Sequence, residues 1–331
     1  MKEILVIGGS RYFGRHLVTL LRDEGHAVTV LNRGSAAPPP GVAHLAADRD
    51  DGGALRAALG TRTFDVVLDQ VCYTAEQAET ARRVFSGGRA GRYVMTSTME
   101  VYDPATLPPG FPVPPAGTDP GPVAEGRIDP TRPGPPSVPR RPEGAAARYA
   151  EGKRRAEAVF LCDPALPYVS VRSAHVLGGG AQDFTGRLAH YVERIAAGLP
   201  VDVHEDPYAT SFIHHREIAR FLAWAALGSF TGPVNAASHG PLTVHGLADR
   251  VAARLGRPAR YRVVEGGREA SPFSFDRAYA LDNGRATRLG FSFAHTGDWL
   301  PGAIEEAVEE AVGEAAGAAV GEPAAPSVPA P

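Results

Sequence analysis

The sequence predicts an α/β protein built on a doubly wound parallel sheet, with a smaller substrate-binding portion toward the C-terminus. Three observations carry this prediction. Short apolar, β-rich runs alternate with segments of helical spacing through the first hundred residues. These runs are apolar almost continuously, which is typical of parallel strands buried on both faces. A glycine-rich stretch follows the first run and precedes the first helical segment, as in doubly wound sheets that bind nucleotides.

The individual elements follow in order along the chain. The predicted strands are 3–9, 26–34, 42–48, 64–70, 92–98 and 167–173. Apolar residues at helical spacing predict helices at 14–24, 51–59, 75–86, 145–162, 187–197, 216–227 and 244–255. From these we expect a nucleotide-binding domain over 1–172, and a substrate-binding portion over 173–310 that partly returns to the sheet.

Two segments break the pattern. Residues 104–142 hold fourteen of the thirty prolines and have no hydrophobic periodicity, so they form neither a helix nor a central strand. This insertion is either a disordered surface excursion or a flap over a site. The Ala-, Gly- and Pro-rich residues 311–331 are expected to be a disordered tail.

Composition excludes several classes of protein. The 331 residues are 44% hydrophobic and 21% charged, with a net charge of −3, so there is no electrostatic reason to bind nucleic acid or an anionic membrane. Two cysteines are too few for a disulfide framework. The N-terminus lacks the pattern of a signal peptide, and no apolar run approaches the ~20 residues that span a bilayer. We expect a cytoplasmic protein, and its assembly state, including a homo-oligomer, stays open.

The glycine loop VIGGSRYFG predicts a site for a dinucleotide. Glycine permits a tight turn, close approach of the backbone to a pyrophosphate, and close helix–strand packing. The amides of the following helix, which begins near Phe13, then point at the pyrophosphate. The loop residues expected to bind the cofactor are Gly8, Gly9, Ser10, Arg11, Tyr12, Phe13 and Gly14.

The end of the second strand distinguishes the two nicotinamide cofactors. An acidic residue there binds the ribose hydroxyls of NAD, whereas an arginine accommodates the 2′-phosphate of NADP. This chain has Asn32 and Arg33 at that position, and Arg11 lies in the glycine loop. Two guanidinium groups suit a phosphate dianion. We therefore expect NADP(H) to be favoured over NAD(H), although both could be ordinary arginines of an arginine-rich chain.

One lysine stands out in this composition. Of 34 basic residues only Lys2 and Lys153 are lysines. Lys153 follows Tyr149 by four residues, which places both side chains on one face of a helix. A tyrosine becomes a useful acid or base near neutral pH when positive charge stabilises its phenolate. A compact ammonium does this and also binds ribose hydroxyls, which the wide fork of arginine cannot do in the same space.

With these residues the chain resembles the extended short-chain dehydrogenase/reductase family, the NAD(P)-dependent epimerase/dehydratase group with a Rossmann-type sheet. The resemblance covers about residues 2–300 apart from the insertion. It implies that Tyr149 and Lys153 are the catalytic Y-x-x-x-K pair and that Thr98, three residues before a Val-Tyr pair, is the catalytic Ser/Thr. The remaining cofactor contacts that it implies are Asp48 at the adenine and Gln70, Val71 and Cys72 at the nicotinamide, closed by the segment after Arg172. An alternative role for Asp48 is to cap the following helix.

The chain also departs from the family pattern. Arg11 replaces the middle glycine of the loop. Thr210 stands where nucleotide-sugar enzymes carry an arginine that grips the diphosphate, and His175 replaces an asparagine. Met99 stands where the dehydratases have an aspartate before Glu100, so the elimination machinery is incomplete. Of these departures, Thr210 and His175 argue against a nucleotide-diphosphate sugar as substrate.

No metal site is expected. His214 and His215 are adjacent and point apart, and with Glu217 they lack the HExxH spacing. Trp224 and Trp299 are expected to be core residues.

Three hypotheses for the function remain. In the first, NADPH reduces a carbonyl of a small molecule, with Tyr149 as proton donor, Thr98 bound to the same oxygen and Lys153 lowering the tyrosine pKa. The second is an epimerase or dehydratase that acts on a sugar and retains its NAD. The third is a non-enzymatic protein that senses nucleotides or binds RNA on the same fold, and the complete Thr98, Tyr149 and Lys153 set argues against it.

Overall fold

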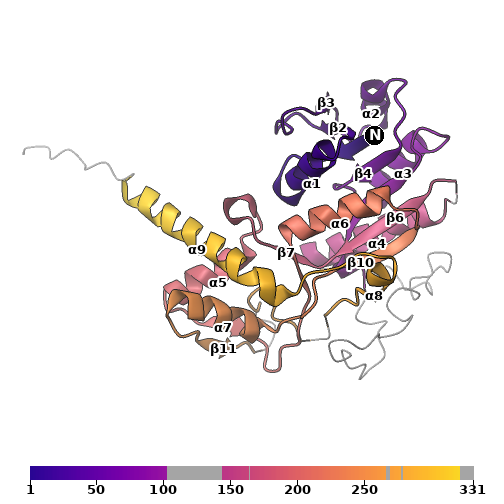
Figure 1. Cartoon of the computed structure of the whole chain (residues 1–331). Helices are drawn as coiled ribbons and strands as arrows, with labels where there is room; N and C mark the ends of the chain where they lie inside the picture. The colour runs from indigo at the N-terminus through magenta and orange to yellow at the C-terminus, as the bar shows by residue number, and fades with distance from the viewer. Residues whose placement is uncertain (103–143, 164, 266–268, 277–278, 321–331) are drawn as a thin grey trace, which may run out of the picture.

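The computed structural model describes residues 1–102, 144–163, 165–265, 269–276 and 279–320. Its centre is a seven-stranded parallel sheet in the order β10-β6-β5-β4-β1-β2-β3 (Figure 1). The fold class predicted from the sequence is confirmed. The strands are β1 (Glu3–Ile7), β2 (Ala27–Asn32), β3 (Ala43–Ala46), β4 (Val66–Asp69), β5 (Tyr93–Thr98), β6 (Tyr168–Ser173) and β10 (Gly232–Ala236).

Helices cover both faces of this sheet, and successive side chains of a strand are buried on opposite faces. In β1, Ile4 and Val6 face a core shared with α1 (Tyr12–Asp23) and α6 (His215–Leu227). Leu5 and Ile7 face the opposite core. The helices on that second face are α2 (Gly52–Leu59), α3 (Ala75–Phe85) and α4 (Ala145–Leu161).

A third hydrophobic cluster lies beside the sheet and is built by the C-terminal half of the chain. It joins α5 (Arg187–Ala196), α7 (Val244–Leu255) and α9 (Thr296–Val320) around β8 (Val201–Val203). Two short parallel pairs of strands lie in this half of the chain. They are β7 (His175–Leu177) with β9 (Phe212–His214), and β8 with β11 (Tyr261–Val263). The remaining short helices are η1 (Met99–Val101), η4 (Gly180–Gln182) and α8 (Gly284–Arg288).

Several details differ from the sequence-based expectations. The predicted first strand ends at Ile7, because Gly8 and Gly9 turn with positive φ. The strand β10 was not predicted, since its sequence contains a glycine and a proline, and an edge strand tolerates both. The helix α9 continues to Val320, so 311–320 are helical where a disordered tail was expected. This stretch is rich in alanine, a strong helix former.

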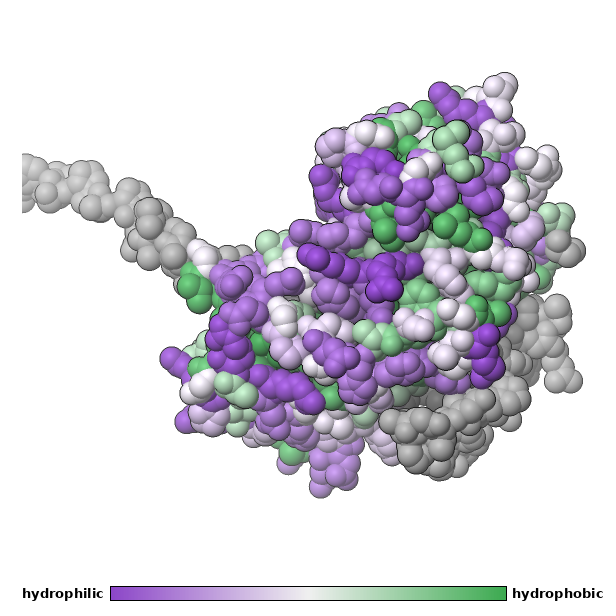
Figure 2. All heavy atoms as spheres, viewed as in Figure 1, coloured by the Kyte–Doolittle hydropathy of each residue, from purple (hydrophilic) through white to green (hydrophobic). Residues whose placement is uncertain are grey.

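The insertion at 104–142 and the last residues, 321–331, lie outside the described residues. Trp224 and Trp299 are partly buried, and each packs against a hydrophobic cluster. In the described part of the chain, no helix has the length and apolarity to cross a membrane. The face in Figure 2 is mostly hydrophilic, with hydrophobic residues in small separate patches.

Candidate active site

The glycine loop has the geometry of an anion-binding turn. Gly8 and Gly9 have φ values of +92° and +77°, which side chains rarely adopt. A Cβ on Gly9 would lie 2.8 Å from Val6 Cγ1, and one on Gly14 would lie 2.8 Å from Gly9 Cα. These glycines therefore allow α1 to lie directly against β1. The helix begins at Tyr12 with no side-chain cap from Arg11, so its first amides are available to an anion.

The side chain of Gln70 supports a cofactor site beside the glycine loop. Its amide packs against Gly14, where a Cβ would overlap Gln70 Oε1. Its Nε2 is buried and has no hydrogen-bond partner among the residues that the structure describes. A buried donor without a partner costs about 1–3 kcal/mol, so such a group calls for an acceptor. Beside the free amides of α1, a pyrophosphate or ribose oxygen is an acceptor of the required kind.

The end of β2 is organised by Asn32. Its Nδ2 donates to Ser10 Oγ at 2.6 Å and to the carbonyl of Ala36 at 2.9 Å, and its Oδ1 accepts from the Gly34 amide at 2.7 Å. Asn32 thus ties the glycine loop to the turn that carries Arg33. The side chain of Arg33 is exposed, as is that of Arg11.

The role of Asp48 as a helix cap is not supported. The cap of α2 is Asp51, which accepts from the Gly53 amide at 2.8 Å and the Ala54 amide at 3.0 Å. Asp48 accepts only a local bond from the Asp50 amide, at 3.0 Å. It is exposed just beyond the end of β3, and its proposed contact with adenine stays a prediction.

Of the residues after β4, Val71 lies at the glycine loop and Cys72 lies in the core. Val71 lies against the glycine loop, 3.2 Å from where a Cβ on Gly8 would be. Cys72, which was expected to line the nicotinamide side, is fully buried among the apolar residues of the second core. Burial raises the pKa of its thiol to about 12. The thiol is therefore neutral.

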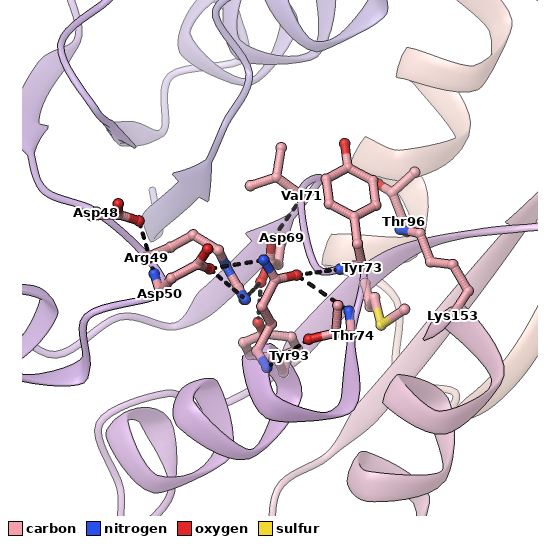
Figure 3. A network of polar contacts seen from close by, with 12 residues as sticks. Asp48, Arg49, Asp50, Asp69, Val71, Tyr73, Thr74, Tyr93, Thr96 and Lys153 are labelled. Carbon is pink, nitrogen blue, oxygen red and sulfur yellow. Dashed lines mark hydrogen bonds and ion pairs between the residues drawn. The ribbon is translucent and has the colours of Figure 1, made fainter. Parts of the chain in front are cut away.

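A buried charged network that the sequence analysis did not anticipate lies beside these residues. Arg49 forms an ion pair with Asp69, the last residue of β4, and the hydroxyl of Tyr93 donates to the same carboxylate at 2.5 Å (Figure 3). Asp69 also accepts from the Val71 amide at 2.9 Å. The only available clue was an acidic residue at the end of an otherwise apolar strand. Its partner, 20 residues earlier, has no local signature.

Thr98 comes from β5, and Tyr149 and Lys153 come from α4, which packs against the end of that strand. Thr98 ends β5, and its Oγ1 accepts from the Glu100 amide at 3.3 Å. Tyr149 lies in the first turns of α4, 39% exposed. Lys153, one turn further, is buried, and its ammonium donates to the carbonyl of Thr96 at 2.7 Å. Thr98 lowers the pKa of Tyr149, and the Tyr149 ring centroid lies 5.8 Å from the Lys153 ammonium.

The pKa values differ from the sequence-based expectation. Burial raises the pKa of Tyr149 to about 12, despite the opposing effects of Thr98 and of the positive charge of Arg187. Burial lowers the pKa of Lys153 to about 8. Near neutral pH the tyrosine is therefore protonated and the lysine is mostly charged. The expected lowering of the tyrosine pKa is absent because burial outweighs the nearby positive charge.

On the substrate side, the two departures from the family pattern are both buried. Thr210 is fully buried, and its hydroxyl donates to the carbonyl of Tyr279 at 2.8 Å. His175 lies among aromatic rings, with Phe273 at 4.9 Å and Phe275 at 5.6 Å between ring centroids. Burial and a nearby arginine lower its pKa to about 3, so the imidazole is neutral.

That arginine, Arg187, was missed by the sequence analysis. It begins α5, with its Nη1 3.3 Å from His175 Nδ1 and its guanidinium over the ring of Phe273 at 5.4 Å. Its positive charge acts on Tyr149. Nothing in the local sequence distinguished it from the many other arginines of the chain.

The two adjacent histidines pack against each other and against a tyrosine ring. His214 and His215 contact each other at 4.4 Å between ring centroids, and His215 stacks on Tyr12 at 5.9 Å. Glu217 accepts from the Ser238 hydroxyl and the Ala294 amide, each at 2.6 Å. Within the described ranges no group of three His, Cys, Asp or Glu residues is placed to hold a metal ion.

Comparison with known proteins identifies the family. The model of the NAD dependent epimerase/dehydratase family matches residues 4–235. The chain belongs to this family. Its members are oxidoreductases and epimerases of the short-chain dehydrogenase/reductase type, so this family member is an enzyme that depends on NAD(P). The resemblance inferred from the glycine loop and the Tyr-Lys pair is confirmed.

Three curated relatives are similar to this family member. A dTDP-4-dehydrorhamnose reductase of Streptomyces griseus is 30% identical over 85% of this chain and 86% of its own length. A 2-alkyl-3-oxoalkanoate reductase of Stenotrophomonas maltophilia is 28% identical, over 77% and 76%. A chloroplast stem-loop binding protein of Arabidopsis thaliana is 32% identical, but the match spans only 30% of each chain.

Solved structures share the fold of this family member. The Bordetella bronchiseptica enzyme WbmH in complex with NAD+ superposes with a TM-score of 0.66 at 18% identity, covering 94% of this chain and 98% of its own. A UDP-glucose 4-epimerase of Thermus thermophilus in complex with NAD gives a TM-score of 0.64 at 20% identity, covering 92% and 98%. At this identity the likeness establishes the fold.

Proposed function

We propose that this enzyme reduces a carbonyl group of a small molecule with NADPH, through Thr98, Tyr149 and Lys153. The observation that carries the proposal is the contact of α4 with the end of β5. The buried ammonium of Lys153 donates to the carbonyl of Thr96, two residues before Thr98, and lies 5.8 Å from the centroid of the Tyr149 ring. A partly exposed acid, a neighbouring hydroxyl and a fixed cation form a site for protonating an oxygen that gains negative charge.

Each side chain has a separate role in this scheme. A nicotinamide cofactor, when bound, supplies the hydride to the carbonyl carbon. Tyr149 donates its proton to the carbonyl oxygen, which yields the alcohol, and Thr98 donates a hydrogen bond to the same oxygen. The ammonium of Lys153 stabilises the resulting tyrosinate. Because 39% of Tyr149 is exposed, water can return the proton after the product leaves.

The protonation state of Tyr149 and the names of two relatives agree with a reduction. With a pKa of about 12, the phenol is protonated at neutral pH, which is the form that a proton donor requires. An oxidation would instead start from the tyrosinate, which is scarce at this pH. The two relatives that match most of the chain are both named as reductases, in agreement with this direction.

The preference for NADPH rests on Arg33 and Arg11. Both are exposed at the carboxyl ends of β2 and β1, where the 2′-phosphate of NADP is expected in doubly wound sheets. The last residue of β2 is Asn32, whose amide group is bonded to Ser10 and to the turn. This position therefore offers no carboxylate to the hydroxyls of an unphosphorylated ribose.

The substrate side is assigned to the segment 173–310, in which the charge of Arg187 acts on Tyr149 and His175 lies beside Arg187. The position that carries a diphosphate-binding arginine in nucleotide-sugar enzymes holds the buried Thr210, whose hydroxyl already has a partner. A small carbonyl compound without a nucleotide diphosphate suits this arrangement better than a nucleotide sugar.

The test is hydride transfer under single-turnover conditions. The purified enzyme is mixed with NADPH carrying deuterium at the transferred position and with a panel of ketones, including a nucleotide-linked 4-ketosugar. Deuterium in the alcohol product, with loss of transfer in Tyr149→Phe, supports the proposal. Tightly retained NAD with no net oxidation, together with inversion of a nucleotide sugar, would instead identify an epimerase.

A further inference from the structure

The ammonium of Lys153 is enclosed by two tyrosine rings. Its Nζ lies 4.5 Å from the centroid of the Tyr73 ring and 5.8 Å from that of Tyr149. The two rings contact each other at 6.1 Å with an angle of 46° between their planes. Both distances lie within the range of about 6 Å over which an ammonium is attracted to an aromatic face. Tyr73 therefore lies at the catalytic pair, although no role has yet been given to it.

The backbone fixes the position of Tyr73. Its amide donates to Gln77 Oε1 at 2.6 Å, and the same glutamine side chain completes the capping box of α3 with Thr74. On the other side, α4 approaches so closely that a Cβ on Gly152 would overlap the carbonyl oxygen of Tyr73. The ring is thus held against the helix that carries Lys153, by contacts that do not involve its own side chain.

The charges around Lys153 leave room for such a role. Asp69 and Glu157 favour the charged ammonium, whereas burial and Arg49 disfavour it. In the described part of the chain, no carboxylate forms an ion pair with Lys153, because Asp69 is paired with Arg49. A buried ammonium without a counter-ion is costly. The face of an aromatic ring offsets part of this cost.

We propose that Tyr73 is a positioning residue, whose ring holds the Lys153 ammonium charged and aimed at Tyr149 and the cofactor groove. Lysine has three donors. One is bonded to the carbonyl of Thr96, and the ammonium that carries all three lies over the Tyr73 ring (Figure 3). This leaves a donor for the ribose or the tyrosine. The catalytic consequence rests on the proposed function, but the cage itself does not.

The composition of the chain makes this directly measurable. Because Lys2 and Lys153 are its only lysines, protein grown with 13C-labelled lysine gives two lysine signals. Lys2 is exposed at the N-terminus and serves as an internal reference, and Lys2→Arg assigns it. Titration of the cofactor-free protein then reports the pKa of Lys153. The variants are Tyr73→Leu, which keeps an apolar cover, and Tyr73→Phe, which keeps the ring face.

We expect the pKa of Lys153 to fall by about half a unit to one unit in Tyr73→Leu, as the loss of a cation–π contact predicts. In Tyr73→Phe it should stay within about 0.2 of a unit, because phenylalanine offers the same kind of face. The Lys2 signal should be unchanged in both. An unchanged Lys153 in Tyr73→Leu would overturn the proposal, and so would an equal fall in Tyr73→Phe, which would assign the effect to the hydroxyl.

A second measurement separates this proposal from the proposed function. The pH dependence of hydride transfer is recorded for the wild type and both variants. In Tyr73→Leu the alkaline limb should move to lower pH by the shift found in the titration, and Tyr73→Phe should restore it. If the wild type transfers no hydride while the titration gives the expected pattern, the proposed reaction fails and the cage stands. If transfer occurs but its alkaline limb is the same in all three proteins, Tyr73 does not position Lys153 for catalysis.

Discussion

Arg172 and Glu157 form an ion pair beneath the candidate site, with Nη2 of the arginine 2.6 Å from Oε2 of the glutamate. Each side chain is only 1% exposed. Glu157 also accepts from the hydroxyl of Ser97 at 2.5 Å, and the guanidinium lies 4.9 Å from the centroid of the Tyr102 ring. Glu157 follows Lys153 by one turn of α4, and Ser97 precedes Thr98 on β5. Glu157 therefore joins α4 to β5, the two elements that carry the catalytic residues, and its ion pair joins both to Arg172 on β6.

Breaking this pair should destabilise the protein strongly. Arg172→Met leaves the buried carboxylate of Glu157 without its cation, and such a loss typically costs about 3–5 kcal/mol of the free energy of unfolding. The double variant Glu157→Leu with Arg172→Met removes both charges and should recover most of this loss. Denaturant unfolding measures it. Arg262→Met, which removes an arginine paired with Asp202 at the surface, should change stability far less. An equally low stability of the double variant would contradict this account.

Lys153→Arg should lose most of its turnover although it keeps the charge. The ammonium fits between Thr96 and the rings of Tyr73 and Tyr149, and a planar guanidinium cannot take the same place. The lost support for proton transfer is typically worth about 10²–10⁴-fold. Cofactor affinity should fall as well. Single-turnover hydride transfer and cofactor titration measure the two effects.

Tyr149→Phe should separate proton donation from cofactor binding. Without the hydroxyl it should lose proton donation by a similar factor of about 10²–10⁴, while binding the cofactor almost as the wild type does. For Lys153→Arg, hydride transfer close to that of the wild type would mean that catalysis does not require a lysine at this position.

The sequence was sufficient for the fold and for the residues that lie near each other along the chain. Apolar runs defined six of the seven strands, since both faces of a parallel sheet are buried. The spacing of Tyr149 and Lys153 placed them on one helical face. The sequence did not predict side-chain contacts between segments that are distant along the chain. Arg49 with Asp69, Arg172 with Glu157, and Tyr73 over Lys153 join distant segments, and no local pattern marks them.

Electrostatics showed a further limit of the sequence. The expectation that Lys153 lowers the pKa of Tyr149 considered one charge and no burial. In the folded chain, burial raises the pKa of Tyr149 and lowers that of Lys153. The size of a desolvation effect depends on the depth of the site, which only the three-dimensional structure provides.

Arg33→Asp should shift the cofactor preference from NADP(H) toward NAD(H). The change removes a partner for the 2′-phosphate and supplies an acceptor for the ribose hydroxyls, and a charge-assisted hydrogen bond is worth about 1.5–3 kcal/mol. The ratio of the two dissociation constants, measured by titration, should change accordingly. Arg56→Asp makes the same change of charge on the exposed side of α2 and should leave the ratio unaltered. Equal ratios in Arg33→Asp and the wild type would rule out Arg33 as the phosphate partner.

The titration of Lys153 should appear in cofactor affinity and in stability with opposite signs. Its pKa in the folded protein is lowered from 10.5 to about 8, so the ammonium loses its charge as the pH rises through about 8. A neutral amine is a weaker donor to the ribose, so cofactor affinity should fall over this range. Between about pH 8 and 10.5 the unfolded chain binds the proton and the folded chain does not, so folding stability should rise with pH. Below pH 8 the cost of burying the charge is fully present, on the order of 3 kcal/mol for a shift of this size.

Lys153→Met provides the reference, because it cannot titrate. Relative to this variant, the wild type should bind cofactor less tightly and resist denaturant better at pH 9.5 than at pH 7. A constant difference between the two proteins in both measurements would show that Lys153 does not titrate in this range.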